Sequence, residues 1–261
     1  MPSKHIHIMG VVNLTPDSFY AASRSAGAEA LARIRAMQAS GAHCVDIGAC
    51  STRPGSAQPS LEEEWERLSP VLSALDSGEG ISIDTYRAEI VRRAYDTVGP
   101  FLVNDVSAGS LDPQMLSTVG RLGLPYVAMH MRGTPASMQA LTDYEDVVEE
   151  VLTYFRAFSR RAAWAGVQDW LLDPGFGFAK TTAQNYELLW RLEELREAGR
   201  PVLVGLSRKS MIYKLLGITP EEAMPLTMTL QWAALQRGAT WLRTHDVPET
   251  AALVNRYLDQ Q

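Results

Sequence analysis

Polar and charged side chains stand where apolar runs of this chain end, and this spacing predicts chemistry on an anion. The run VLVGL is followed directly by Ser207, Arg208 and Lys209. A strand that ends in this way delivers a hydroxyl, a guanidinium and an ammonium into one loop, where all three can donate hydrogen bonds to an anionic group. The first chemistry that the sequence predicts is therefore anion binding at a strand end.

Other apolar runs end in the same manner. A single polar residue within such a run is explained by a structural ion pair, but a set of them indicates a functional site, because polar groups are costly to bury without partners. For Asp46, Asp105 and His130, a structural role stays open beside a role in the pocket. The remaining strand-end residues are Asn13, Thr52, Arg53, Asp84, Asn104, Asp173, Arg243 and His245.

One half of this set suits a neutral heterocycle. Asp84, Asn104 and Asp173 offer two carboxylates and an amide to a ligand with several N–H donors. An aminopyrimidinone edge has this pattern, because a carboxylate can accept two parallel N–H hydrogen bonds. Met129 and Phe178 add apolar contacts to a flat ring.

The other half suits phosphate oxygens and a divalent cation. It comprises Asn13, Arg53, Arg243 and His245. The amide carbonyl of Asn13 is a ligand for a hard cation, and Mg²⁺ typically keeps waters and substrate phosphates as its other ligands. Lys209 can serve either half.

The elements that must position these residues alternate along the whole chain. Strict alternation of apolar runs with helix-like segments predicts parallel strands, and eight pairs close a barrel whose site lies at the C-terminal strand ends. We therefore predict an α/β fold, a (β/α)8 TIM barrel in a single domain over 1–261, with a doubly wound open sheet as the alternative. The predicted strands are 5–12, 43–48, 80–85, 101–106, 126–131, 170–175, 202–207 and 240–245. The predicted helices are 27–40, 61–76, 87–98, 113–122, 143–165, 184–198, 220–237 and 248–259.

Two signals mark the start of the helix predicted over 61–76. Ser60 and Glu63 have the spacing of a capping box. The acidic cluster Glu62, Glu63 and Glu64 is expected to complement the helix dipole and to need no ligand.

Composition narrows the class of protein further. The 261 residues carry a formal charge of −6 and show no basic stripe, which argues against a nucleic-acid binder. No apolar run approaches the length that spans a membrane. Cys44 and Cys50 are too close in the chain for a disulfide framework, so we expect a reducing, cytoplasmic location.

Eight motifs, in order, resemble the dihydropteroate synthase family over nearly the whole chain. They are MGVVNLTPDSF (9–19), DIGACSTRPGS (46–56), SIDT (82–85), NDVSAG (104–109), MHMRGTP (129–135), LDPGFGFAK (172–180), GLSRKSMI (205–212) and RTHDV (243–247). The resemblance implies a transferase that condenses a dihydropterin methyl diphosphate with p-aminobenzoate and releases diphosphate. It also implies Mg²⁺ as cofactor and a homodimer.

The same resemblance assigns roles to individual residues. It implies that Asp84, Asn104, Asp173 and Lys209 hold the pterin, and that Asn13, Arg243 and His245 bind Mg²⁺ and the diphosphate. Thr52 and Arg53 match a loop that closes over the substrates, and Phe178, Ser207 and Lys209 match the region around p-aminobenzoate. Asp84, Asp173, Lys209, Arg243 and His245 are the implied catalytic residues.

Three departures from the family pattern keep other functions open. The segment YAASRS (20–25) lacks the usual acid and glycines, Ala49 and Cys50 replace glycine and glutamate, and Ala179 replaces a glycine. One alternative is a non-catalytic pterin-binding paralogue. The other is a pterin-dependent methyltransferase barrel, which releases no diphosphate and has no need for the cations at 207–209 and 243–245.

Overall fold

Eight parallel strands form the centre of the molecule in the computed structural model, which describes residues 5–14, 24–50, 58–134 and 137–260. The sheet order β6-β5-β4-β3-β2-β1-β8-β7 is that of a barrel, and a parallel bridge between Leu172 and Val202 links its two edge strands. The predicted (β/α)8 barrel is thereby confirmed, and the open sheet is wrong. The strands are β1 His7–Asn13, β2 Cys44–Gly48, β3 Ile81–Asp84, β4 Leu102–Asp105, β5 Tyr126–Met129, β6 Trp170–Asp173, β7 Leu203–Val204 and β8 Trp241–Thr244.

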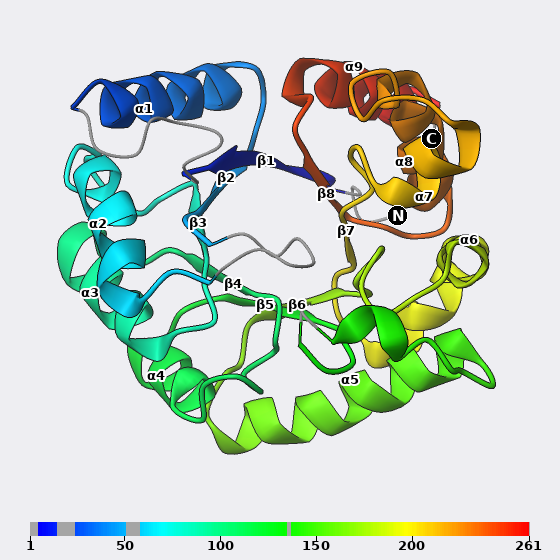
Figure 1. The fold of residues 1–261 in the computed structure, drawn as a ribbon, viewed down its shortest axis with the longest axis horizontal. Coiled ribbons are helices and arrows are strands. Elements are labelled where there is room, and N and C mark those ends of the chain that lie inside the picture. The colour runs from blue at the N-terminus through cyan, green and yellow to red at the C-terminus, as the bar shows by residue number, and fades with distance from the viewer. Residues whose placement is uncertain (1–4, 15–23, 51–57, 135–136, 261) are drawn as a thin grey trace.

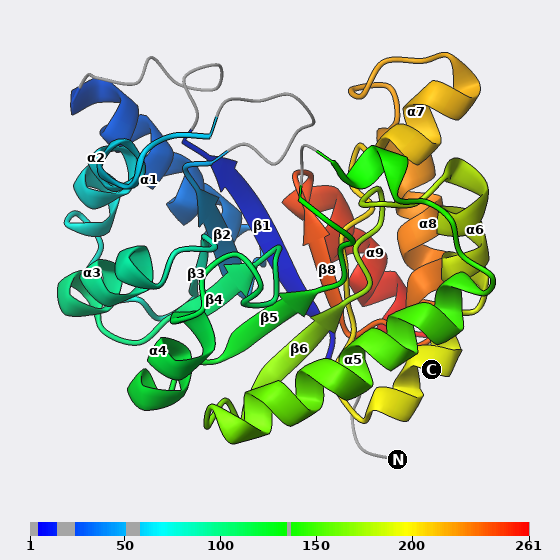
Figure 2. The ribbon, with the colours of Figure 1, turned by 60° about the horizontal axis from the view of Figure 1, so that its bottom comes forward.

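Helices surround the strands, as Figure 1 shows looking down the barrel and Figure 2 shows from the side. The α-helices are α1 Arg24–Ala39, α2 Leu61–Leu72, α3 Ala88–Val98, α4 Met115–Leu122, α5 Val147–Trp164, α6 Thr182–Trp190, α7 Ser210–Leu216, α8 Met224–Gln236 and α9 Val247–Leu258. Two short 3₁₀ helices, η1 Met138–Ala140 and η2 Leu192–Ala198, complete the elements of the described residues.

The helix pattern differs from the sequence prediction in two places. The helix predicted over 184–198 breaks at Arg191, whose φ of −113° leaves the helical region and separates α6 from η2. Directly after the SRK motif, the unpredicted α7 is only seven residues long and ends at Gly217 in a left-handed conformation. A segment of two turns shows too little periodicity to be recognised in a sequence.

At the start of α2, the capping box is confirmed and the acidic cluster is partly corrected. The Glu63 N–H donates to Oγ of Ser60 at 3.2 Å, and the Ser60 N–H donates to the Glu63 carboxylate at 2.7 Å. Glu64, by contrast, is fully buried, accepts a hydrogen bond from Thr85 at 2.6 Å and pairs with Arg87. Glu64 therefore ties α2 to the end of β3 instead of facing water.

The alternation of side chains along each strand explains where the site lies. An interior cluster of Met9, Cys44, Leu102, Val127, Leu171 and Leu203 fills the N-terminal half of the barrel. Successive strand residues point to opposite faces, so residues two positions further on point the same way. Leu102 is thus followed on the interior by Asn104, and Leu171 by Asp173. The barrel interior becomes polar toward the C-terminal strand ends.

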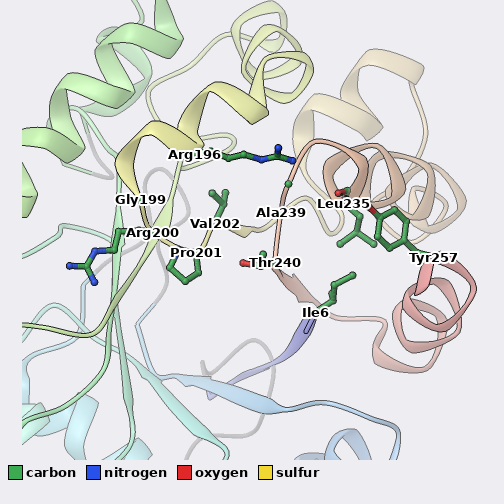
Figure 3. Close-up of a pocket in the computed structure, with 11 residues that line it drawn as sticks. Ile6, Arg196, Gly199, Arg200, Pro201, Val202, Leu235, Ala239, Thr240 and Tyr257 are labelled. Atoms are coloured by element: carbon green, nitrogen blue, oxygen red, sulfur yellow. Dashed lines mark hydrogen bonds between the residues drawn. The ribbon is translucent and has the colours of Figure 1, made fainter. Parts of the chain in front are cut away.

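A cavity of about 340 Å³ lies at the opposite, N-terminal end of the strands (Figure 3). Ile6, Val202 and Tyr257 give it apolar walls, and the guanidinium groups of Arg196 and Arg200 are its charged lining groups. Among the described residues that line it there is no carboxylate. Its charged groups are thus cations, whereas the carboxylates and the amide named from the sequence lie at the C-terminal strand ends, where we place the candidate active site.

Candidate active site

Asp46 is the centre of a buried hydrogen-bond network that joins four strands. It is fully buried on β2 and accepts from Ser82 of β3 at 2.7 Å and from the Asn104 amide of β4 at 2.9 Å. The guanidinium of Arg243, on β8, lies 2.6 Å from the same carboxylate. The structure therefore gives Asp46 the structural role that the sequence left open, since all these contacts orient other residues.

Arg243 also reaches Asp84, at 3.4 Å from its carboxylate. Burial and the nearby Asp46 carboxylate raise the pKa of Asp84 to about 8. Burial lowers the pKa of Arg243, but Asp46 and Asp84 outweigh this and hold it above its usual value. The sequence placed Arg243 with the phosphate half, whereas the structure places it in contact with Asp84 of the heterocycle half.

Asn104 and Asp173 keep hydrogen-bond acceptors available at this end of the barrel. Because the Asn104 amide nitrogen donates to Asp46, its oxygen is left to accept from a ligand. Asp173 is buried at the end of β6, and its Oδ1 accepts from the Gly175 N–H at 2.8 Å. Burial raises the pKa of Asp173, while the Gly175 hydrogen bond and the positive charge of Lys209 oppose the shift.

Lys209 and Phe178 lie together beside these acceptors. The Lys209 ammonium is 4.7 Å from the centre of the Phe178 ring, within the range of a cation–π contact. Burial lowers the pKa of Lys209 to about 8, and Asp173 opposes that shift. Phe178 packs against the buried cluster that contains Met129, so an apolar wall stands next to the polar group.

Ser207 and His245 form a second pair at the ends of β7 and β8. Oγ of Ser207 lies 3.0 Å from Nδ1 of His245 and accepts from its backbone N–H at 3.2 Å. His245 is an exposed residue, but partial burial of its ring and the nearby Arg243 charge lower its pKa to about 4. Near neutral pH the imidazole is therefore uncharged and acts as a hydrogen-bonding group, whereas the sequence predicted a cation.

Arg208 is turned away from this pair. It has a φ of 54°, and its guanidinium lies 2.5 Å from the Asp246 carboxylate. This ion pair fixes the loop after β7 to the loop after β8. Of the three polar residues that end the VLVGL run, Ser207 and Lys209 thus lie in the site, and Arg208 supports it.

For the remaining predicted site residues, the structure gives a strand position for Asn13 alone. Asn13 ends β1 opposite Gly48 of β2, at the same end of the barrel. Thr52 and Arg53 lie outside the described residues. Within the described ranges, no group of three or more His, Cys, Asp or Glu side chains is placed to hold a metal ion. The donor chemistry still fits Mg²⁺, which commonly takes one or two protein oxygens and completes its shell with substrate phosphates and water.

Two strand-end residues have purely internal partners. Asp105 accepts from the Ser107 and Gly109 backbone N–H groups at 2.7 and 2.8 Å and from the Tyr126 hydroxyl at 2.6 Å, so it holds the turn after β4. His130 contacts the ammonium of Lys180 at 2.9 Å, and both residues are buried. Lys180 was not identified as a site residue from the sequence. Its place at the end of the glycine-rich turn after Asp173 could have indicated a role at the site.

Cys50 carries no sign of a reactive thiol. Burial and the neighbouring Glu64 raise its pKa, so it is protonated at neutral pH. Its sulfur lies 3.9 Å from the Arg87 guanidinium. Cys50 therefore belongs with the packing around the Glu64–Arg87 pair.

The arrangement has a definite chemical capacity. Asp84, Asn104 and Asp173 can accept hydrogen bonds from a flat heterocycle, and Lys209 can donate one. Arg243 can donate to anionic oxygens beside it, and so can one member of the hydrogen-bonded Ser207–His245 pair. Fold and site together define a barrel enzyme that binds a nitrogen heterocycle next to an anionic group.

Comparison with known proteins assigns the chain to a family within this class of enzymes. The family model described as "Pterin binding enzyme" matches residues 9–245, which include all eight strand ends. The chain belongs to this family and, within it, to the dihydropteroate synthases, which are transferases.

Sequence and structure relatives agree on this assignment. The chain is 41% identical over 251 residues to the dihydropteroate synthase of Escherichia coli K12, covering 94% of this chain and 88% of that protein. It is 42% identical over 261 residues to that of Synechocystis sp., covering 96% and 88%. The Yersinia pestis dihydropteroate synthase with a sulfonamide drug complex superposes with a TM-score of 0.92 at 35% identity, covering 100% of this chain and 96% of that one. For the Xanthomonas albilineans enzyme with 4-aminobenzoic acid, the TM-score is 0.87 at 38% identity, covering 98% and 93%.

These comparisons favour the synthase over the methyltransferase barrel and the non-catalytic paralogue.

None of the helices in the described ranges is long and apolar enough to span a bilayer.

Proposed function

We propose that this dihydropteroate synthase binds its pterin diphosphate and p-aminobenzoate at the strand-end site described above. One observation carries the proposal: Asp84, Asn104 and Asp173 offer acceptors at one end of the barrel, and Arg243 lies among them. A pterin has an aminopyrimidinone edge with several N–H donors, and its diphosphate needs a nearby cation. The site offers groups for both parts of the substrate.

The first chemical step breaks the bond between the pterin methylene carbon and the diphosphate oxygen. The bonding electrons leave with that oxygen, and Arg243 stabilises the charge that develops there. The neutral His245 donates a hydrogen bond from Nε2 to the same group, while its Nδ1 accepts from the Ser207 hydroxyl and holds the ring in place. Mg²⁺, when bound with Asn13 among its ligands, would neutralise further negative charge on the diphosphate.

The methylene left behind is electron-poor and shares its positive charge with the pterin ring. The carboxylates of Asp84 and Asp173 lie against that ring in the proposed complex and stabilise the charge. The amine of p-aminobenzoate, next to Phe178 and Lys209, then forms the new carbon–nitrogen bond. It loses one proton to the departing diphosphate or to water, so no covalent bond to the protein is needed.

An assay for diphosphate release tests this function. The protein is incubated with the pterin diphosphate and Mg²⁺, with and without p-aminobenzoate, and dihydropteroate is measured alongside diphosphate. We expect equal amounts of both products when the amine is present. A protein that binds the pterin but forms no dihydropteroate would instead be the non-catalytic paralogue.

We also propose a homodimer in the cytoplasm. Trp190 on α6, Leu215 and Leu216 on α7, and Leu226 on α8 expose large apolar side chains. A second copy of the chain would cover them, because isolated apolar surface favours association. Leu216→Lys should shift the sedimentation coefficient toward the monomer, whereas Leu111→Lys, on the β4–α4 loop, should not. An unchanged dimer in Leu216→Lys would exclude this surface.

A further inference from the structure

The ammonium group of Lys180 is enclosed by three acceptors in the turn that follows β6. The residue is only 5% exposed. Its Nζ lies 2.9 Å from Nδ1 of His130 and 3.1 Å from each of the backbone oxygens of Gly175 and Phe178. Burial lowers the pKa of Lys180 to about 7, and in its protonated form the three N–H donors each have one acceptor.

The three acceptors connect parts of the site that are separate in the chain. Gly175 begins the turn, and its N–H donates to the Asp173 carboxylate at 2.8 Å. Phe178 lies near the end of the turn and contributes the ring that faces Lys209. His130 directly follows β5, and burial together with the charge of Lys180 lowers its pKa well below the usual value. A neutral His130 can accept from the ammonium, so Lys180 joins both ends of the turn to β5.

The turn needs such support because its backbone is unfavourable. Gly175, Gly177 and Ala179 have φ values of 70°, 83° and 49°, all in the left-handed region. For alanine, which has a Cβ, this conformation is less favourable than the right-handed one. Apart from Lys180, the Asn185 side chain supports the turn by accepting from the Gly177 N–H at 2.7 Å. Asn185 holds the middle of the turn, whereas Lys180 holds the carbonyl of Phe178 itself.

We propose that Lys180 is a positioning residue for Phe178, and that through the Phe178 ring it fixes the Lys209 ammonium where the aromatic amine binds. Lys180 is buried behind the turn and touches neither substrate. Its effect on the reaction is therefore indirect and falls mainly on the second substrate. The inference rests on the proposed function, since it assigns p-aminobenzoate to the space beside Phe178.

Replacement of Lys180 by methionine tests the proposal, because methionine fills similar space without a donor. We expect the KM for p-aminobenzoate to rise about tenfold, the loss that corresponds to about 1.4 kcal/mol of binding. The KM for the pterin diphosphate should rise less, by about threefold or below, because only Asp173 of the three pterin acceptors contacts the turn, whereas Asp84 and Asn104 do not. Tyr257→Phe is the control, since it removes a buried hydrogen bond to the Leu235 carbonyl at the far end of the barrel and should change neither KM.

A second pair of variants separates positioning from general loss of stability. His130→Gln keeps an acceptor for Lys180, and His130→Leu removes it. We expect the glutamine variant to have a KM for p-aminobenzoate closer to that of the wild type than the leucine variant has. This pair also decides the matter if Lys180→Met does not fold.

Two results would overturn the proposal: an equal rise in both KM values in Lys180→Met, or no difference between the two His130 variants. Failure of the proposed function itself would be distinct, since the wild-type protein would then form no dihydropteroate.

Discussion

The guanidinium of Arg243 lies 2.6 Å from the carboxylate of Asp46, although 197 positions separate the two residues in the chain. Barrel closure makes this contact possible, because β8 pairs with β1 and β1 pairs with β2. The same guanidinium reaches Asp84 on β3. Arg243 therefore orders Asp46 and Asp84, and in the proposed complex it is close enough to the site to meet the diphosphate.

Arg243→Met should leave Asp46 and Asp84 without a cation. Removing one partner of a buried ion pair costs about 3–5 kcal/mol, and we expect a loss near the lower end because Arg243 is 22% exposed. Binding of the pterin diphosphate should weaken more than binding of a pterin without phosphate. Urea unfolding and titration calorimetry measure the two effects.

The double variant Arg243→Met with Asp46→Asn is the matched control for this prediction. It removes one of the unpaired carboxylates, so it should recover part of the stability but none of the affinity for diphosphate. Wild-type affinity in the double variant would show that Arg243 does not contact the diphosphate.

Asp84→Asn should reduce kcat/KM by roughly 10- to 100-fold, since a hydrogen bond to a charged group is worth about 1.5–3 kcal/mol. The amide keeps the shape of the side chain but cannot accept two parallel N–H hydrogen bonds. Asp105→Asn provides the comparison, because Asp105 bonds only within the turn after β4 and to Tyr126. It should lower the free energy of unfolding by about 1–3 kcal/mol and leave both KM values unchanged. Near-normal turnover in Asp84→Asn would remove Asp84 from the pterin site.

The pH profile of kcat/KM for the pterin diphosphate should be a narrow bell centred near pH 8. Asp84 has a pKa of about 8 in the free protein, so the carboxylate that accepts from the pterin is lost as the pH falls below that value. Lys209 also has a pKa of about 8, so its positive charge is lost as the pH rises. Asp84→Asn should abolish the acidic limb and keep the basic limb. A profile that is flat between pH 6 and 8 in the wild type would contradict the assignment.

The fold and the positions of the main site residues could be predicted because both follow from regular alternation. Eight strand–helix pairs define the barrel, and the two-residue period of a strand carries the interior from Leu102 to Asn104 and from Leu171 to Asp173. In each pair the sequence shows both the apolar residue that packs in the core and the polar residue two positions later that lies in the site. The same logic located Arg243 on β8, whereas Lys209 lies beyond β7, at the start of α7, and was found from the polar residues that follow the apolar run.

Pairings between strands could not be predicted in the same way. Asp46 was open to either role because its partners lie on β3, β4 and β8, and nothing in the apolar run around it indicates them. The charge of His245 depends on the protein atoms around its ring and on Arg243, neither of which is local in the sequence. Lys180 was missed for a related reason: its importance comes from His130, 50 positions away.

Asn13 carries the last prediction, which concerns the metal. If its amide oxygen is a ligand of Mg²⁺, Asn13→Ala should raise the Mg²⁺ concentration for half-maximal turnover by about tenfold, corresponding to about 1.4 kcal/mol. Saturating Mg²⁺ should restore most of kcat, because the diphosphate and water supply the other ligands. Asn13→Asp keeps an oxygen and adds a negative charge, so it should require less Mg²⁺ than Asn13→Ala. Binding of a pterin without diphosphate should not depend on Mg²⁺ in any of these proteins, and turnover that survives chelation by EDTA would exclude the metal from the reaction.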